Sequence, residues 1–277
     1  MVAIVTDSAA NLPADLAVEL GIHVVPLHLT IGDRVYRDGV DIHMQEFYEE
    51  LQAGNEVAST SAPSPGDFLE TFQGLPPGED IVCVTVAAAV SATNQSARRA
   101  AEQLDRRIEI VDSTNASMAE GFVAVEAARL AAAGVATEAI VRRAEEVAVR
   151  SRIFATIDTF EFLRRSGRVR RAQAYAATML NIKPVFRFQD GDADGVARPR
   201  TRSRALDRIV QDTLTEAAGR RIHLAAFHAL AEQDAKELVR RVEAEAEVIE
   251  SYVVEATPVI GAHTGPGLVG TAFHCDS

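Results

Sequence analysis

The stretch that most constrains the fold is residues 81–105, where an apolar run is followed directly by a helical pattern. Residues 81–86 are mostly β-branched, which predicts a buried strand of a parallel sheet. After a short alanine-rich turn, Ser91 precedes a helix predicted over residues 92–104. A helix that begins at the carboxyl end of a parallel strand is a usual ligand position, and its unpaired N–H groups favour an anion. Capping of the helix by Ser91, without any ligand, is the alternative.

The same order of strand and then helix recurs through the first 150 residues. Apolar runs predict strands at 2–6, 22–29, 81–86 and 108–111, with residues 35–36 in a hairpin. Pro26 predicts a bulge or an edge position for the strand 22–29. Helical spacing and capping residues predict helices at 14–20, 43–51, 65–72, 92–104, 117–133 and 138–149. This order is typical of an open parallel α/β sheet.

The second half has a different pattern. Strands are predicted at 153–157, 182–188, 196–201, 222–227, 248–253 and 268–273, and helices at 159–165, 173–180, 203–218 and 232–244. Pro184 favours an edge position for the strand 182–188. We therefore predict an α/β fold with two domains: an open, mostly parallel sheet domain over residues 1–150 and an α+β domain over residues 151–277.

Two hydroxyl residues stand in a loop without a local structural role. Residues 56–68 are rich in Ser, Thr and Pro, which predicts a loop. Within it, Ser64 has the form of a helix cap. Thr60 and Ser61 have no such explanation, so we take them as candidate ligand-binding residues.

The histidines and cysteines do not form a recognisable metal site. His23 and His28 are five residues apart in a strand-like run, which places their rings on opposite faces, and the pair at 223 and 228 repeats this spacing. His263 differs, because it lies in the glycine-rich segment 260–267, predicted as a loop that a ligand can approach closely; a solvated loop histidine is the alternative. The two cysteines make no disulfide framework. We expect no metal and no cofactor.

Charge and motifs exclude several function classes. The net charge of −12 argues against nucleic-acid and anionic-membrane binding. There is no GxxxxGK[ST] phosphate-binding loop, no GxGxxG dinucleotide motif and no GxSxG nucleophile motif. No apolar run approaches the ~20 residues of a membrane span, and the first residues lack the pattern of a signal peptide. We expect a cytoplasmic protein without stable membrane insertion.

Arginines gather at two places in this acidic chain. The first group is Arg164, Arg165, Arg168, Arg170 and Arg171, and the second is Arg198, Arg200, Arg202, Arg204 and Arg208. In the second group, arginine occupies every other position from 198 to 204, which predicts basic residues on one side of a strand. Such a surface suits an anionic partner or phosphate, whereas a solvated face paired with local acids is the alternative.

Motifs along nearly the whole chain resemble one bacterial family, the DegV family of fatty-acid-binding proteins. They are TDS at 6–8, VVPL at 24–27, YRDGVDI at 36–42, TSAPSP at 60–65, VSATNQSA at 90–97, VDS at 111–113, FLRRSGRVRRAQA at 162–174, LNIKPV at 180–185 and IGAHTGPG at 260–267. The TSxPS segment together with the GxHxGPG segment is the most specific part. At 91–96 the family usually has SGTYQS, where this chain has SATNQS.

The resemblance implies a fatty acid held between two domains, with its carboxylate near the TSxPS segment and the helix start after residue 91. Transferred to this chain, the ligand-binding residues are Thr60, Ser61, Ser91, Ala92, Thr93 and His263. Some family members are the acyl-carrying subunit of a fatty acid kinase, in which a separate ATP-binding protein phosphorylates the bound carboxylate for phospholipid synthesis. We therefore expect a carrier rather than an enzyme, with Arg168, Arg200 and Arg202 facing the kinase.

Two other functions remain open at this point. The first is a kinase-like subunit that resembles the dihydroxyacetone kinases and binds a small carbonyl substrate covalently through His263. The second is a phosphate-responsive regulator that uses the arginine groups on nucleic acid, which the net charge disfavours.

Overall fold

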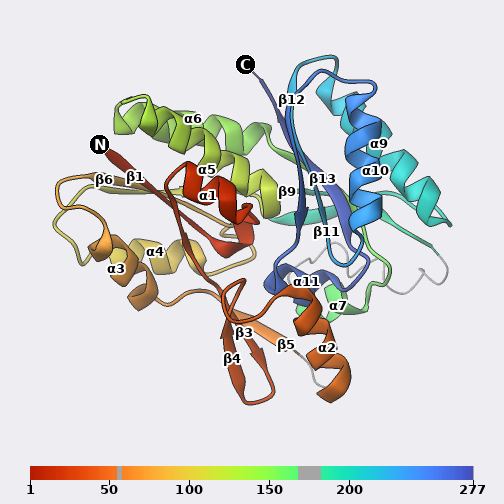
Figure 1. Cartoon of the computed structure of the whole chain (residues 1–277), viewed down its shortest axis with the longest axis horizontal. Helices are drawn as coiled ribbons and strands as arrows, with labels where there is room; N and C mark the ends of the chain where they lie inside the picture. Colours follow the sequence, from red (N-terminus) through yellow and green to blue (C-terminus); the bar gives the residue numbers. More distant parts are fainter. Residues whose placement is uncertain (55–57, 168–181, 277) are drawn as a thin grey trace.

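A computed structural model describes residues 1–54, 58–167 and 182–276. Its first half contains a four-stranded parallel sheet in the order β2-β1-β6-β7 (Figure 1). The strands are β1 (Val2–Asp7), β2 (Ile22–Val25), β6 (Asp80–Thr85) and β7 (Ile108–Asp112). On one face pack α3 (Pro65–Gly74) and α4 (Thr93–Ala101), and on the other α1 (Ala14–Glu19), α5 (Ser117–Ala132) and α6 (Thr137–Arg150). Because both faces are covered, the central strands β1 and β6 are apolar over most of their length, as the sequence predicted.

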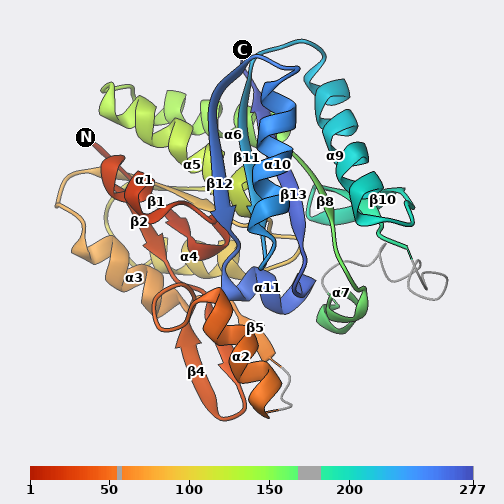
Figure 2. The same cartoon turned by 45° about the vertical axis from the view of Figure 1, so that its right-hand side comes forward.

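The second half is built on a six-stranded mixed sheet in the order β10-β9-β8-β13-β11-β12. Its strands are β8 (Arg152–Thr156), β9 (Val185–Gln189), β10 (Asp192–Ala197), β11 (Ile222–His228), β12 (Val248–Glu255) and β13 (Val269–Cys275). The helices α9 (Arg202–Ala217) and α10 (Glu232–Glu243) cover one face, as Figure 2 shows from the side. The opposite face turns toward the first half of the chain.

A small three-stranded antiparallel sheet, in the order β4-β3-β5, extends below the two larger sheets in Figure 1. It consists of β3 (His28–Ile31), β4 (Arg34–Arg37) and β5 (Ala58–Ser61), beside α2 (Met44–Gly54). Three short helices complete the described elements: the 3-10 turn η1 (Ser8–Ala10), α7 (Glu161–Ser166) and α11 (Pro258–Thr264). The helix α11 contacts α2, α7 and β5, so it joins the small sheet to the rest of the molecule.

One apolar core spans both halves of the chain. Met118 and Phe122 of α5 belong to the same buried cluster as Ala225 and Phe227 of β11. Hydrogen bonds reinforce the contact: the Asn11 side chain donates to the Glu255 carbonyl and accepts from the Thr257 N–H. The predicted fold class is therefore confirmed, whereas the division at residue 150 stays a prediction.

Proline explains two of the differences from the predicted strands. Residues 22–29 form two strands, β2 and β3, in two different sheets, because Pro26 interrupts the run. The single strand predicted there is therefore wrong. The predicted edge strand 182–188 begins later, at Val185, and lies inside the sheet between β8 and β10, since Pro184 precedes its first hydrogen-bonded residue.

Three further segments differ in type or in bounds. Residues 58–61, predicted as loop, form β5 because they pair with β3. The predicted loop 260–267 begins inside α11, which Pro258 opens and whose Gly261 carbonyl accepts a hydrogen bond from the Tyr48 hydroxyl. The strand predicted at 196–201 as the antiparallel partner of 182–188 is present but begins earlier: β10 spans Asp192–Ala197 and pairs with β9. The predicted helix 173–180 lies outside the described residues.

Candidate functional site

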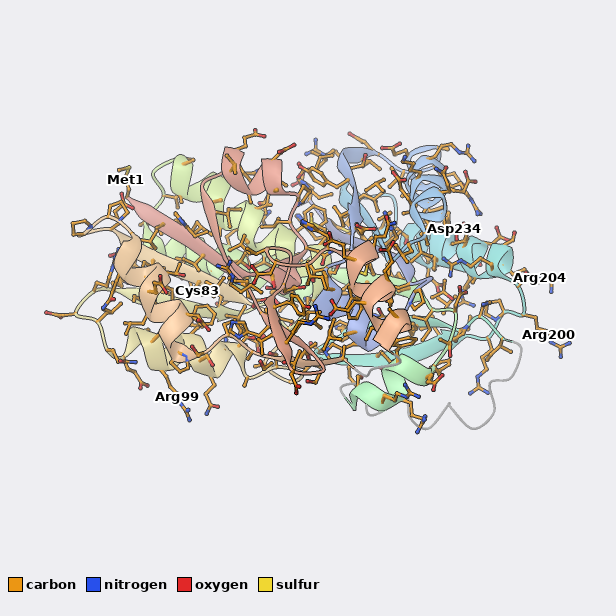
Figure 3. All side chains as sticks on the ribbon, turned by 60° about the horizontal axis from the view of Figure 1, so that its bottom comes forward. Met1, Cys83, Arg99, Arg200, Arg204 and Asp234 are labelled. Atoms are coloured by element: carbon orange, nitrogen blue, oxygen red, sulfur yellow. The ribbon has the colours of Figure 1, made fainter. Side chains whose placement is uncertain are left out.

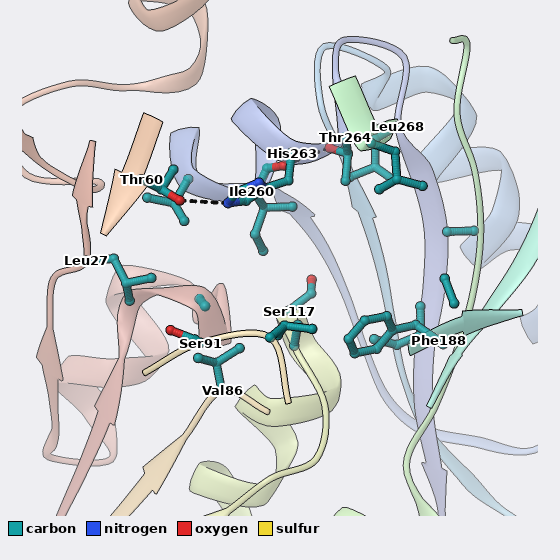
Figure 4. A pocket seen from close by; sticks show the side chains of 18 of the residues that line it. Leu27, Thr60, Val86, Ser91, Ser117, Phe188, Ile260, His263, Thr264 and Leu268 are labelled. Carbon is teal, nitrogen blue, oxygen red and sulfur yellow. Dashed lines mark hydrogen bonds between the residues drawn. The ribbon is translucent and has the colours of Figure 1, made fainter. Parts of the chain in front are cut away.

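A cavity of about 360 Å³ lies between the two halves of the chain and the small sheet. This volume is within the range of small-molecule pockets, about 300–1,000 Å³. Most of its wall is hydrocarbon (Figure 4). The apolar lining residues are Ala9, Leu27, Ala62, Val86, Val90, Ala92, Ala116, Ile153, Ala155, Leu163, Phe186, Phe188, Ala193, Phe227, Val259, Ile260 and Leu268. The polar ones are Thr60, Ser61, Ser91, Ser117, His263 and Thr264.

Thr60 and His263, which are 203 residues apart in sequence, meet at one side of this cavity. The distance between Thr60 Oγ1 and His263 Nε2 is 2.8 Å, drawn as a dashed line in Figure 4. The strand β5 presents Thr60, and the short helix α11 presents His263. A Cβ on Gly261 would lie 2.8 Å from Met44 Sδ, so the glycine allows α11 to pack closely on α2. This packing fixes the position of His263 against Thr60.

Ser91 lines the cavity just before α4 begins. Its hydroxyl forms a hydrogen bond of 2.8 Å with Thr93 Oγ1 and also accepts one from the Thr93 N–H. The N-cap position belongs to Ala92, whose side chain cannot cap, and the Ser91 hydroxyl instead satisfies the N–H of Thr93, the first residue of α4. Thr93 is fully buried behind Ser91 and does not line the cavity.

Two buried carboxyl groups support the wall of the cavity from behind. Asp7 Oδ1 accepts a hydrogen bond from the Ala9 N–H, and Asp7 Oδ2 accepts one from the Val86 N–H; both residues line the cavity. Burial raises the pKa of Asp7 to about 7. Burial, and secondly the neighbouring Asp7, raises the pKa of Glu120 well above its usual range. The pair therefore holds at least one proton near neutral pH.

Asp38 performs a similar structural role where the small sheet meets α11. Its carboxylate accepts hydrogen bonds from the Ser8 hydroxyl, at 2.7 Å, and from the Val259 N–H, at 2.9 Å. The Ser8 hydroxyl in turn accepts from the Leu27 N–H. Since Leu27 and Val259 both line the cavity, Asp38 joins opposite parts of its wall.

The two predicted partner-facing arginines that the structure describes, Arg200 and Arg202, do not line this cavity. Arg202, on the first turn of α9, donates to Asp234 Oδ2 at 2.7 Å and to the Gly267 carbonyl. It lines a second hollow of about 1,060 Å³, with Asp158, Lys183, Lys236 and Glu255. Arg200 is exposed and projects from the edge of the molecule in Figure 3. Neither arginine is on a strand, which corrects the predicted alternation, and Arg168 lies outside the described residues.

One group of metal-ligand residue types lies close together among the residues that the structure describes. Ligand atoms of Glu126, His223 and His274 are within 4.8 Å of one another. However, Arg129 and Arg143 pair with Glu126, and the two imidazole rings stack at 5° with their centroids 4.4 Å apart. A metal ion cannot lie in two parallel ring planes at once, so this arrangement does not fit a shared ion.

The sequence did not predict most of the apolar wall or the hydroxyl groups of Ser117 and Thr264. Phe186, Phe188 and Phe227 face the cavity from β9 and β11, but nothing in a strand pattern tells which face meets a ligand. Ser117 was read as the start of a helix. Its position shortly after the polar turn at the end of β7 was the available signal.

Taken together, the cavity offers hydrocarbon surface along most of its wall and hydroxyl and imidazole groups at one side. A cavity of this kind can bind an amphipathic molecule that has one polar end. In the described part of the chain, no helix is both long and apolar enough to cross a membrane.

Comparison with known proteins agrees with this architecture. The family model described as "Uncharacterised protein, DegV family" matches residues 1–275. A DegV domain-containing protein of Caldanaerobacter subterraneus is 34% identical over 98% of each chain. The structure described as fatty acid binding of a DegV family protein from Thermus thermophilus superposes with a TM-score of 0.94 at 32% identity, over 99% of both chains. DegV of Bacillus subtilis, described as a fatty acid binding protein, gives a TM-score of 0.88 at 29% identity over 99% of both chains. The present chain therefore belongs to the DegV family.

Proposed function

We propose that this protein binds one long-chain fatty acid in the apolar cavity and presents its carboxylate to a separate ATP-dependent kinase. The observation that carries the proposal is the combination of a hydrocarbon wall with the Thr60–His263 pair and Ser91 at one side. The related proteins from Thermus thermophilus and Bacillus subtilis are described as fatty acid binding, which supports it.

The energetics of such a ligand agree with the lining. Burial of each methylene contributes about 0.8 kcal/mol, so a long acyl chain gains roughly 10 kcal/mol before the costs of association. The carboxylate must exchange water for other donors. The Thr60 and Ser91 hydroxyls and the His263 ring are positioned to supply them.

A small carbonyl substrate fits this site less well. Dihydroxyacetone would need several hydrogen-bonding partners, whereas most of the cavity wall offers only hydrocarbon. His263 Nε2 is also held by Thr60 Oγ1 at 2.8 Å. These contacts favour the carrier over the kinase-like alternative.

The kinase partner is the second part of the proposal. The chain has no phosphate-binding loop motif, so we expect ATP and its magnesium ion to come with another protein. The acyl-phosphate that results would then serve phospholipid synthesis in the cytoplasm. The proposed contacts are Arg202, beside the charged hollow, the exposed Arg200, and Arg168, which lies outside the described residues. Arginine binds phosphate and carboxylate groups in a bidentate manner, which suits either docking or charge neutralisation.

Native mass spectrometry of the purified protein, followed by titration with fatty acids, tests the binding step. We expect a co-purified long-chain acid, and an affinity that rises from decanoic to longer saturated acids before a plateau. An empty protein that gains the mass of dihydroxyacetone, or equal affinity for all chain lengths, would contradict the proposal. The isolated protein should also consume no ATP.

A further inference from the structure

The hydroxyl group of Ser117 differs from the other buried hydroxyl groups of the cavity wall because it has no hydrogen-bond partner. Ser117 lines the cavity and is 3% exposed, and its Oγ has no hydrogen-bond partner. Figure 4 shows the residue on the cavity side at the start of α5, between Ser91 and Phe188. A buried hydroxyl without a partner is unfavourable, so a residue of this kind in a ligand cavity indicates a missing partner on the ligand.

The other partly buried hydroxyl groups of the wall already have partners. Thr60 Oγ1 is bonded to His263 Nε2, Ser91 Oγ to Thr93 Oγ1, and Thr264 Oγ1 donates to the Ile260 carbonyl at 2.8 Å. Ser61 is exposed and can be solvated. Among the described residues, Ser117 is therefore the buried lining residue whose hydroxyl forms no hydrogen bond within the protein.

The backbone holds Ser117 firmly in this position. Its φ is 52°, in the left-handed region that favours glycine. The preceding turn is fixed on both sides: the Thr114 carbonyl accepts a hydrogen bond from the Gly191 N–H, and the Asn115 side chain donates to the Ala148 carbonyl. A non-glycine residue kept in a sparsely populated conformation by its surroundings is a frequent mark of a functional position.

We propose that the cavity accepts a fatty acid that carries a hydroxyl group on its chain, and that Ser117 recognises this group by a hydrogen bond. The inference rests on the proposed fatty-acid binding and adds the class of acyl chain. The protein already shields Ser117 Oγ from water, and a saturated chain returns no hydrogen bond to it. A double bond would give only a weak contact, since hydrogen bonds to π systems are second-order. A chain hydroxyl can both donate and accept.

The test compares stearic acid, oleic acid and positional isomers of hydroxystearic acid on the full-length protein. The variants are Ser117→Ala and Ser117→Gly; the glycine variant suits the positive φ and should fold even where alanine is strained. Thr264→Val is the matched control, because it removes a lining hydroxyl that already has a partner within the protein.

The measured preference is the Kd for stearic acid divided by the Kd for a hydroxystearic isomer. For one isomer, we expect this ratio to be about five- to tenfold higher in the wild-type protein than in either Ser117 variant. Part of this change should come from tighter binding of stearic acid by the variants. Thr264→Val should keep the wild-type preference.

The inference is overturned if every isomer keeps its affinity relative to stearic acid in both Ser117 variants, or if oleic acid alone depends on Ser117. In those cases the proteins still bind fatty acids, so the proposed function stands. If the wild-type protein binds none of these acids, the proposed function itself fails.

Discussion

The carboxyl ends of parallel strands form two different hollows in this molecule. At the ends of β1 and β6 lies the apolar cavity, with Asp7 fully buried behind it. At the ends of β11 and β12, His228 and Glu255 line the charged hollow, where the side chain of Asp158 is 46% exposed. Such strand ends are common ligand positions in α/β proteins.

The difference between the two hollows comes from what covers them. The small sheet and α11 cover the ends of β1 and β6, so carboxyl groups there are desolvated and bind backbone N–H groups. The ends of β11 and β12 stay open, and their charges form surface ion pairs, such as Lys183 with Asp158 and Arg202 with Asp234. Equivalent topology thus gives an enclosed apolar cavity in one place and an open charged hollow in the other.

The largest expected effect comes from filling the apolar cavity. Ala193→Phe adds a ring to a buried lining position on the edge strand β10. A ring that displaces about four methylenes of the ligand should weaken long-chain binding about 200-fold, at about 0.8 kcal/mol for each methylene. Decanoic acid should be affected much less. Titration with both acids measures this.

The matched change in the other hollow is Val253→Phe, at a position that is 38% exposed. It should leave fatty-acid binding unaltered. If Ala193→Phe and Val253→Phe weaken fatty-acid binding equally, the cavity does not hold the acyl chain.

The second prediction concerns the polar side of the cavity. Thr60→Val and Ser91→Ala each remove a hydroxyl that we expect to meet the carboxylate, which should cost about 1.5–3 kcal/mol of binding free energy. Ser59→Ala is the control, because Ser59 precedes Thr60 on β5 and is exposed on the opposite face. Calorimetric titration of the folded variants gives the answer. If both cavity variants bind like the wild type, the head group lies elsewhere.

The third prediction follows from the buried acids. The folded protein raises the pKa of Asp7 to about 7 and that of Glu120 above its usual range, both chiefly by burial. Unfolded carboxyl groups titrate near pH 4, so from about pH 4 to 7 the folded state holds protons that the unfolded state has released. The free energy of unfolding should therefore fall as the pH rises through this window, by up to about 1.4 kcal/mol per pH unit for each proton.

Glu120→Gln should reduce this slope and raise the melting temperature at pH 8, since glutamine can still accept from Thr6 Oγ1. Denaturant unfolding between pH 4.5 and 8 measures the effect. The exposed Glu145→Gln should follow the wild-type profile. Parallel profiles for all three proteins would mean that Glu120 does not carry a proton in the folded state.

The smallest effect is expected at the open hollow. Arg202→Ala should leave fatty-acid binding unchanged and slow phosphorylation several-fold with a cognate kinase. If Arg202 docks the kinase, excess kinase should restore the rate, and added salt should mimic the variant. If it neutralises charge during transfer, saturating kinase cannot restore the rate. Full activity of an Arg200→Ala, Arg202→Ala double variant would exclude both roles.

Local sequence signals predicted the elements whose structure is locally determined. Ser64 accepts a hydrogen bond from the Asp67 N–H, and Asp67 accepts one from the Ser64 N–H, as the capping pattern indicated. The central strand β6 and the helix α4 after it are also confirmed. The sequence signal for each of these elements lies in residues that are close together in the chain.

Long-range contacts account for what the sequence did not predict. Residues 58–61 have little strand character of their own and become β5 only by pairing with β3. The glycines on either side of His263 indicate a loop in the sequence. In the structure, packing of α11 on Met44 and Tyr48 favours a helix there. The contact between Thr60 and His263 depends on the pairing of β5 and on the packing of α11. Sequence patterns therefore could not predict its geometry, although the resemblance to the family indicated the two residues.

The position of β13 has a consequence for the order in which the protein can be made. This strand, Val269–Cys275, lies between β8 and β11 and is the link between the two parts of the six-stranded sheet. Until the ribosome has released these residues, β8–β10 and β11–β12 cannot join. Leu268, which lines the cavity, arrives at the same moment. The nascent chain therefore completes the cavity only when β13 is available, and the apolar faces of both parts stay open to aggregation until then.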